Sequence, residues 1–391
     1  MADAYIVAGT RTAGARKGGR LREWEPSDLG AAVLNELIDK TGIPGDKVDD
    51  VIFGCVSQVG AQTGNIARTA ILGSKLPITV PGTTVDRQCG SSQQALHFAA
   101  QAVMSGTQDI VIAGGVESMT KVPIGAAVLD GLKAGHGHPH EGKYLQKKYP
   151  KARFSQFSGA EMVAREFNVS REDMDIFALG SHKKAEAATK AGNFCEEILV
   201  LEGVDKEGNR VVHDVDEGIR FGSTLEGLQN LDPLTPDGCI TAGTSSQICD
   251  GASALMVVSE KALKEFGLTP IVKIKALALA GTDPVMMLAG PIPATQAALK
   301  RALLGIEDID LYEVNEAFGA VPLAWAKELH ADLDKLNVNG GAQALGHPLG
   351  ATGTKLMTTL MYEMKRRNAK FGLLAICEGG GTANATIVEA C

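Results

Sequence analysis

The sequence predicts an α/β fold of two similar half-domains with a loop domain inserted between them. Short β-branched runs alternate along the chain with alanine-rich helical patterns, which is typical of a mainly parallel sheet. The order of these elements recurs in the second half of the chain, whereas a stretch of about 130 residues between the halves falls outside the recurrence.

Each predicted element follows from a local pattern. Strands are expected where Val, Ile and Leu gather in runs of about five residues, at 5–8, 51–56, 109–113, 271–274, 311–314 and 373–377. Helices are expected where apolar residues recur at helical spacing, at 28–41, 92–105, 294–304 and 352–367.

The repeat becomes visible when the two halves are aligned by element. The helix at 28–41 ends in Gly-Ile before a strand, and the helix at 294–304 also ends in Gly-Ile before a strand. Each half then continues with a glycine-rich opening, a helix and a strand that runs into glycines. We therefore divide the chain into an N-terminal half-domain (1–118 and about 251–268), a loop domain (119–250) and a C-terminal half-domain (269–391). The highly charged loop domain is expected to form a lid or a ligand-binding wall.

Composition excludes several classes of protein. The 391 residues include 38 basic and 46 acidic side chains, a formal charge of −8, and no Lys/Arg block, so a nucleic-acid partner is not expected. The seven scattered cysteines are typical of free thiols in a reducing compartment, and no secretory signal is visible. A cytoplasmic location is therefore expected. The most apolar long window, 274–299, is interrupted by aspartate and prolines and is not expected to span a membrane.

Cys89 is the first candidate for chemistry. It lies at 86–92, where a strand-like pattern changes to a helical one. A thiol at a helix N-terminus meets unpaired N–H groups and the positive end of the helix dipole, and both favour the thiolate. The alternative is a buried structural cysteine.

His347 is the candidate base for this thiol. Glycine precedes it and proline follows it, so it is expected on a rigid turn that suits a group reaching into a cleft. In the repeat, this turn precedes the counterpart of the helix that Cys89 opens, so the two helix starts should meet at one interface. The alternative is a solvent-exposed turn histidine. The stretch 346–355 resembles a phosphate loop but lacks its Gly-Lys pair.

Two further candidates follow predicted strands, where ligands meet open α/β sheets. Cys377 ends the last of these strands and precedes Gly379 and two more glycines, whose N–H groups suit an oxyanion. Asn315 follows the strand at 311–314. The alternatives are a core cysteine and a helix N-cap.

The histidine tract at His136, His138 and His140 has the spacing of a metal site. A lid-loop tract is the simpler interpretation, and no metal is expected there.

Four ordered motifs in the sequence closely resemble those of the thiolase family. They are Cys-Gly-Ser-Ser at 89–92, Asn-Glu-Ala-Phe at 315–318, Gly-His-Pro-x-Gly-Ala-x-Gly at 346–353 and Cys-x-Gly-Gly-Gly at 377–381. The resemblance covers essentially the whole chain. It implies a thiolase-like fold, in which each half-domain is a mixed sheet covered by helices.

The resemblance also implies Claisen chemistry on CoA thioesters. Cys89 would be acylated, His347 would activate it, and Cys377 would be the acid/base for the acetyl-CoA carbanion. Asn315, through a water molecule, and His347 would form one oxyanion hole; the N–H groups of Cys89 and Gly379 would form the other. Coenzyme A would be a substrate, no metal or redox cofactor would be bound, and the chain would form a homodimer or homotetramer.

The resemblance assigns the binding residues as well. Arg220 and Ser246 would contact CoA, and Met287 would line the acyl pocket. The sequence departs from short-chain biosynthetic thiolases at 155–162 and 377–384, which favours longer or bulkier acyl chains. The alternatives are an acetoacetyl-CoA thiolase, an inactive thiolase-like assembly subunit, and a ketoacyl carrier-protein synthase, against which Cys377 argues.

Overall fold

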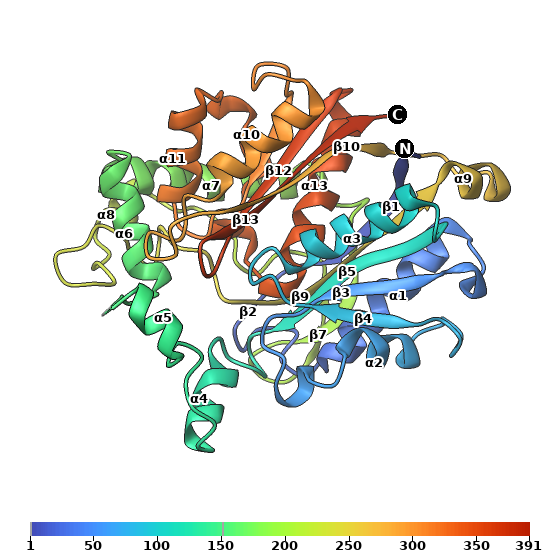
Figure 1. Ribbon diagram of the computed structural model, residues 1–391, viewed down its shortest axis with the longest axis horizontal. Coiled ribbons are helices and arrows are strands. Elements are labelled where there is room, and N and C mark those ends of the chain that lie inside the picture. The colour runs from blue at the N-terminus through green and yellow to red at the C-terminus, as the bar shows by residue number, and fades with distance from the viewer. Residues whose placement is uncertain (1, 151) are drawn as a thin grey trace.

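A computed structural model describes residues 2–150 and 152–391, and an eleven-stranded mixed sheet runs through it (Figure 1). The order along the sheet is β11-β12-β13-β10-β1-β9-β5-β3-β4, with β2 beside β9 and β6 beside β1. The strands are β1 (Ala4–Thr12), β2 (Ala15–Arg16), β3 (Asp50–Gly54), β4 (Gly82–Val85), β5 (Ile110–Ser118), β6 (Ile198–Leu199), β9 (Cys249–Ser259), β10 (Val272–Gly281), β11 (Leu311–Val314), β12 (Phe371–Glu378) and β13 (Thr382–Ala390).

The two halves of this sheet have the same topology. The order β3-β5-β9-β1 in the first half corresponds to β11-β12-β13-β10 in the second. In both, the first pair of strands is parallel and the next two pairs are antiparallel. The halves join where β1 pairs antiparallel with β10. The predicted fold of two similar halves is therefore confirmed.

The expectation of a mainly parallel sheet is wrong. A turn of three glycines, 379–381, joins β12 directly to β13, and so short a connection can join only antiparallel neighbours. The alternation of strands and helices revealed the parallel pairs, but it carried no information about the last strand of each half.

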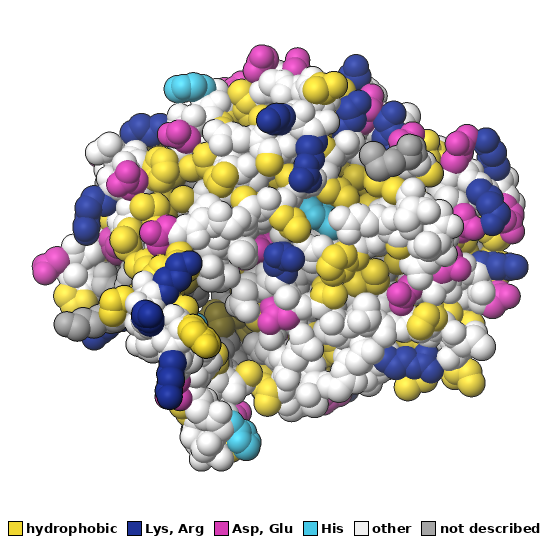
Figure 2. All heavy atoms as spheres, viewed as in Figure 1, with side chains coloured by type: hydrophobic (Ala, Val, Ile, Leu, Met, Phe, Trp, Pro, Cys, Tyr) yellow, Lys and Arg dark blue, Asp and Glu magenta, His cyan; other side chains and the backbone are white. Residues whose placement is uncertain are grey.

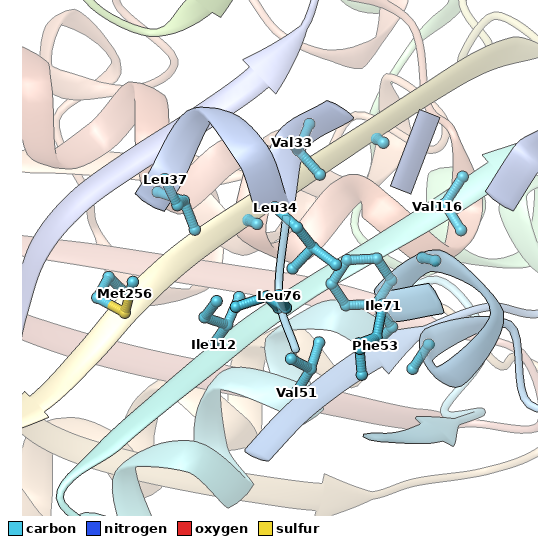
Figure 3. Packing of buried hydrophobic residues seen from close by; sticks show 14 of the residues in the cluster. Val33, Leu34, Leu37, Val51, Phe53, Ile71, Leu76, Ile112, Val116 and Met256 are labelled. Atoms are coloured by element: carbon cyan, nitrogen blue, oxygen red, sulfur yellow. The ribbon is translucent and has the colours of Figure 1, made fainter. Parts of the chain in front are cut away.

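Equivalent helices cover equivalent faces. In the first half these are α1 (Pro26–Thr41), α2 (Ile66–Gly73) and α3 (Ser91–Ser105); in the second they are α10 (Pro291–Ala302), α11 (Ala320–Leu329) and α13 (Thr352–Arg367). Figure 3 shows side chains of α1, including Leu34, packed on Val51, Phe53 and Ile112 of the sheet. The helices α3 and α13 share one central apolar cluster with strands of both halves.

The stretch between β5 and β9 lies outside the repeated topology of the sheet. It contains α4 (Ala126–Lys133), α5 (Lys143–Lys148), α6 (Gln156–Glu166), α7 (Arg171–Lys190), α8 (Leu225–Gln229) and a separate hairpin of β7 (Leu201–Val204) and β8 (Arg210–His213). The helices α4 and α5 bury no residue and project from the body (Figure 1), whereas α6 packs on α11. Two further short helices lie outside this stretch: α9 (Glu260–Phe266) follows β9, and α12 (Ala342–Leu345) precedes α13.

The charge of the surface and the apolar character of the helices bear on the kind of partner that the protein can have. On the face drawn in Figure 2, basic and acidic side chains are interspersed. None of the helices in the described residues combines the length and apolar character needed to cross a bilayer.

In the histidine tract, the rings of His138 and His140 pack edge to face at 5.0 Å, and His140 packs in the same way on Phe154 at 4.8 Å. Within the described ranges, no three His, Cys, Asp or Glu side chains form a group suited to a metal ion.

Candidate active site

The starts of helices α3 and α13 lie in contact, as the repeat predicted. The N–H of Thr354 in α13 donates to the Ser92 hydroxyl of α3 at 3.1 Å. A Cβ at Gly353 would overlap the backbone nitrogen of Gln93, so glycine at position 353 is required by the close approach. Cys89 lies just before α3 and His347 just before the short 3-10 turn that leads into α13, so both belong to this junction.

Cys89 is partly buried, and its sulfur faces the N–H groups of Cys89 itself and of Gly379. These N–H groups favour the thiolate, as expected at a helix start. Burial and the nearby Glu378 outweigh them and raise the pKa of Cys89 to about 12. The prediction that the helix start yields a low pKa is therefore wrong in net direction. The free protein holds Cys89 as a thiol, which needs a base to become a nucleophile.

His347 is buried, and its hydrogen bonds determine which ring nitrogen carries the proton. Its Nδ1 lies 2.6 Å from the Thr352 hydroxyl, which in turn donates to the Pro348 carbonyl at 2.8 Å. Because the Thr352 proton is used in this way, the hydrogen-bond network assigns the His347 proton to Nδ1 and leaves Nε2 unprotonated, as an acceptor. Burial and the Lys355 charge lower the pKa of His347 to about 3, so the imidazole is neutral at pH 7.

Asn315 lies beside the free nitrogen of His347. Its Nδ2 is 3.4 Å from His347 Nε2, and its Oδ1 is buried without a hydrogen-bond partner among the described residues. Asn315 follows β11, and its own N–H donates to the Ala375 carbonyl of β12 at 3.0 Å. This bond fixes the residue at the carboxyl end of two parallel strands, where the sequence placed it.

Cys377 is buried near the end of β12. Burial, the neighbouring Cys89 and Glu378 raise the pKa of Cys377 well above its usual value, so its thiol keeps its proton. It shares one apolar cluster with Met287 and Phe318. Met287 adopts a left-handed backbone conformation with φ of 62°. The structure therefore brings Cys89, Cys377 and Met287 to the same region.

Arg220 lies in a separate cavity of about 380 Å³ that also contains His182, Gln247 and Gln343. The N–H of Arg220 donates to Nδ1 of His182 at 3.2 Å, and burial lowers the pKa of His182 to about 4. A guanidinium beside such a cavity suits a phosphate group. Ser246 and Met287 do not line this cavity, although Ser246 precedes Gln247, and its N–H donates to the Ala317 carbonyl at 2.9 Å.

A buried ion network joins the loop domain to both halves of the sheet. Arg11 of β1 bonds to Glu197 at 2.6 Å and to both oxygens of Asp216 at 2.9 and 3.1 Å. Lys355 of α13 lies 3.8 Å from Asp216 and donates to the carbonyls of Leu345 and Gly346. Those carbonyls belong to the two residues before His347, so the network supports the turn that carries the base.

Replacing Arg11 with methionine is expected to lower the free energy of unfolding by about 3–5 kcal/mol, because two buried carboxylates lose their shared cation. The matched control is Arg210→Met, since Arg210 is 63% exposed and bonds only to exposed glutamates. That control is expected to cost about 0–1 kcal/mol. Urea unfolding monitored by tryptophan fluorescence measures both, and equal costs would contradict the role of the network.

Three residues of the site were not identified from the sequence. Thr352 sets the His347 tautomer, His182 contacts the Arg220 backbone, and Glu378 lies against the Cys89 loop. Thr352 lies within the Gly-His-Pro motif at 346–353, and Glu378 lies within the Cys-x-Gly-Gly-Gly motif at 377–381. Both occupy positions that the motif leaves open to any residue. The contacts of His182 and Glu378 join distant segments, and no pattern in the chain indicates them.

Comparison with known proteins agrees with this geometry. Residues 4–261 match the family model of the thiolase N-terminal domain, and residues 268–390 match that of the thiolase C-terminal domain. The chain is 49% identical over 390 residues to the steroid 3-ketoacyl-CoA thiolase FadA6 of Mycobacterium tuberculosis, covering 100% of this chain and 94% of that protein. It is 44% identical to a 3-ketoacyl-CoA thiolase of Yersinia pestis, covering 100% of both chains. It is 43% identical to one of a Marinomonas species, covering 99% and 98%.

Proposed function

The chain belongs to the thiolase family of acyltransferases, and on that premise we propose that it cleaves 3-ketoacyl-CoA with coenzyme A. The products are acetyl-CoA and an acyl-CoA shortened by two carbons, and the reverse reaction is a Claisen condensation. The observation that carries this proposal is the pairing of a thiol whose sulfur faces two backbone N–H groups with a neutral histidine at the same helix junction.

In the first half of the reaction, Cys89 gives its proton to His347 Nε2 and its sulfur attacks the 3-keto carbon. The N–H groups of Cys89 and Gly379 would form the oxyanion hole for the 3-keto oxygen, which becomes negative as the sulfur attacks. The bond between C2 and C3 then breaks, and its electron pair leaves on acetyl-CoA. Cys377 donates its proton to that carbon, and an acyl-Cys89 thioester remains.

In the second half, the thiol of a free coenzyme A attacks the acyl-Cys89 carbonyl. Its proton replaces the one that Cys377 gave up, and the Cys89 sulfur leaves and recovers its proton from His347. This second half exchanges one thioester for another, so the acyl-Cys89 intermediate is close in free energy to the acyl-CoA product. Asn315, through a water molecule, and His347 would form the other oxyanion hole, which binds the thioester oxygen of the acetyl-CoA unit.

The finer assignments are also proposals. Arg220 would bind a CoA phosphate, because its cavity offers the guanidinium and hydrogen-bonding side chains. Ser246 would contact the pantetheine arm, and Met287 the acyl chain. We also propose that the chain binds no permanent cofactor and forms a homodimer or homotetramer. Its proposed location is the cytoplasm, and its domains have the boundaries given above.

The substrate is proposed to be a 3-ketoacyl-CoA longer or bulkier than acetoacetyl-CoA. The relatives compared above are named for 3-ketoacyl-CoA, one of them for a steroid-derived substrate. In the structure, the Phe157 ring of α6 packs edge to face on Phe318 at 5.7 Å, and Phe318 belongs to the apolar cluster of Met287 and Cys377. This aromatic pair offers apolar surface to an acyl chain.

We expect kcat/KM for thiolysis to rise at least about tenfold from acetoacetyl-CoA to a 3-ketoacyl-CoA several carbons longer. Each buried methylene contributes roughly 0.8 kcal/mol, so even two suffice for this factor. Initial rates across a series of chain lengths measure it. A maximum at acetoacetyl-CoA would favour the short-chain alternative, and absence of thiolysis with every substrate would favour the inactive subunit.

A further inference from the structure

A carboxyl group that the proposed reaction does not use lies against the loop of the nucleophile. Glu378 follows Cys377 at the end of β12, and its side chain is fully buried. A Cβ placed on Gly90 would overlap Glu378 Oε1 and lie 2.8 Å from its Cδ. Glycine at 90 is therefore required by Glu378, and the carboxyl reaches the residue next to Cys89.

Neutral groups hold this carboxyl in place. The Thr382 hydroxyl donates to Oε2 at 2.7 Å. The Asn384 amide faces Oε1 at 2.6 Å. When Glu378 is ionised, the NH₂ group of Asn384 donates to Oε1 and the Asn384 oxygen accepts from the Gln94 N–H of α3 at 3.2 Å. Glu378 is thereby tied through β13 to the first turn of the helix that Cys89 precedes.

The charged and titratable groups around Glu378 come from two segments, the one between β4 and α3 and the end of β12. Arg87 and Asp86 lie in the segment between β4 and α3, and their charges act on Glu378 in opposite directions; the titratable thiols facing it are Cys89 and Cys377. Burial raises the pKa of Glu378 to about 8. A negative charge on Glu378 raises the pKa of both cysteines. The carboxyl is thus neutral around pH 7 and opposes the thiolate once it ionises.

We propose that Glu378 is a positioning residue that fixes the Cys89 loop through Gly90 and that must keep its proton for Cys89 to form its thiolate readily. The proton of Cys89 goes to His347 Nε2, and Glu378 neither gives nor takes one during the reaction. Ionisation of Glu378 at alkaline pH then slows every step that needs the Cys89 thiolate. The inference rests on the proposed role of Cys89 as the nucleophile.

The test is the rate of alkylation of Cys89 by iodoacetamide, followed by mass spectrometry of the Cys89 peptide. In the wild type, the rate should rise about tenfold per pH unit up to about pH 8 and then flatten partly, to about threefold over the next pH unit, because ionised Glu378 raises the pKa of Cys89. In Glu378→Gln, which keeps the shape and lacks the charge, the rise should continue without flattening. The two rates should agree within about twofold at pH 7 and differ about tenfold near pH 9.5, for a coupling of one pKa unit.

Two more variants make the assignment specific. Asp86→Asn removes another carboxyl from the same surroundings and should leave the flattening in place, and Glu378→Asp keeps a carboxyl and should show it too. The proposal would be overturned if the alkylation rate still flattens in Glu378→Gln, or if it no longer flattens in Asp86→Asn. A loss of alkylation at pH 7 in a Glu378→Gln protein with unchanged melting temperature would also overturn it. Alkylation needs no turnover, so a wild type with the expected profile but no thiolysis would contradict the proposed function alone.

Discussion

Replacement of Cys89 with alanine is expected to abolish thiolysis, with kcat falling on the order of 10⁴–10⁶-fold. In the proposed reaction the acyl group is transferred to this sulfur, and the neighbouring thiol of Cys377 is not expected to replace it. Cys377 is held with its proton by burial and by the neighbouring Cys89, so it does not become a substitute nucleophile. The disappearance of 3-ketoacyl-CoA in the presence of coenzyme A measures the effect.

Cys195→Ala is the matched control, because Cys195 is exposed and lies in the loop domain. It should retain wild-type kcat. In addition, acetyl-CoA should transfer an acetyl group to the Cys89 peptide of the wild type, a mass increase that the alanine variant cannot show. Wild-type thiolysis by Cys89→Ala, or an acetyl group found on a different cysteine, would contradict the assigned nucleophile.

Much of this site could be predicted because its chemistry is carried by short local motifs. The turn around His347 and the helix start at Cys89 are each defined by neighbouring glycines, and the repeat predicted that they meet. The bond from Thr354 to Ser92 now shows that contact. Asn315 and Cys377 were placed correctly because a residue that follows a strand lies at that strand's carboxyl end.

Properties that depend on particular side-chain contacts, whether local or distant in the chain, could not be predicted. The helix start at Cys89 does supply the expected N–H groups, but burial, and then Glu378 from the far end of the chain, raise the pKa of Cys89. The proton on His347 Nδ1 depends on a hydroxyl whose own proton is bound to the Pro348 carbonyl. Neither contact has a pattern in the sequence. The same holds for the network of Arg11, which joins three parts of the fold.

Replacement of Cys377 with alanine is expected to separate the two halves of the chemistry. The nucleophile, its base and the N–H groups of Cys89 and Gly379 all remain, so acetyl-CoA should still acetylate Cys89 at a rate within about tenfold of the wild type. The proton transfer at the acetyl-CoA carbon should be lost, and thiolysis should fall about 10²–10⁴-fold, the usual contribution of a general acid or base.

Exchange of the acetyl-CoA methyl protons with deuterated water measures this proton transfer without net turnover. The exchange should disappear in Cys377→Ala while the acetyl-Cys89 peptide is still formed. Met287→Ala serves as the control for packing, because Met287 shares the apolar cluster of Cys377 but has no proton to transfer. If that variant loses exchange as completely as Cys377→Ala, the effect comes from disturbed packing. If Cys377→Ala exchanges at the wild-type rate, another group performs the proton transfer, and a thiol whose raised pKa keeps it protonated would then serve only the core of the protein.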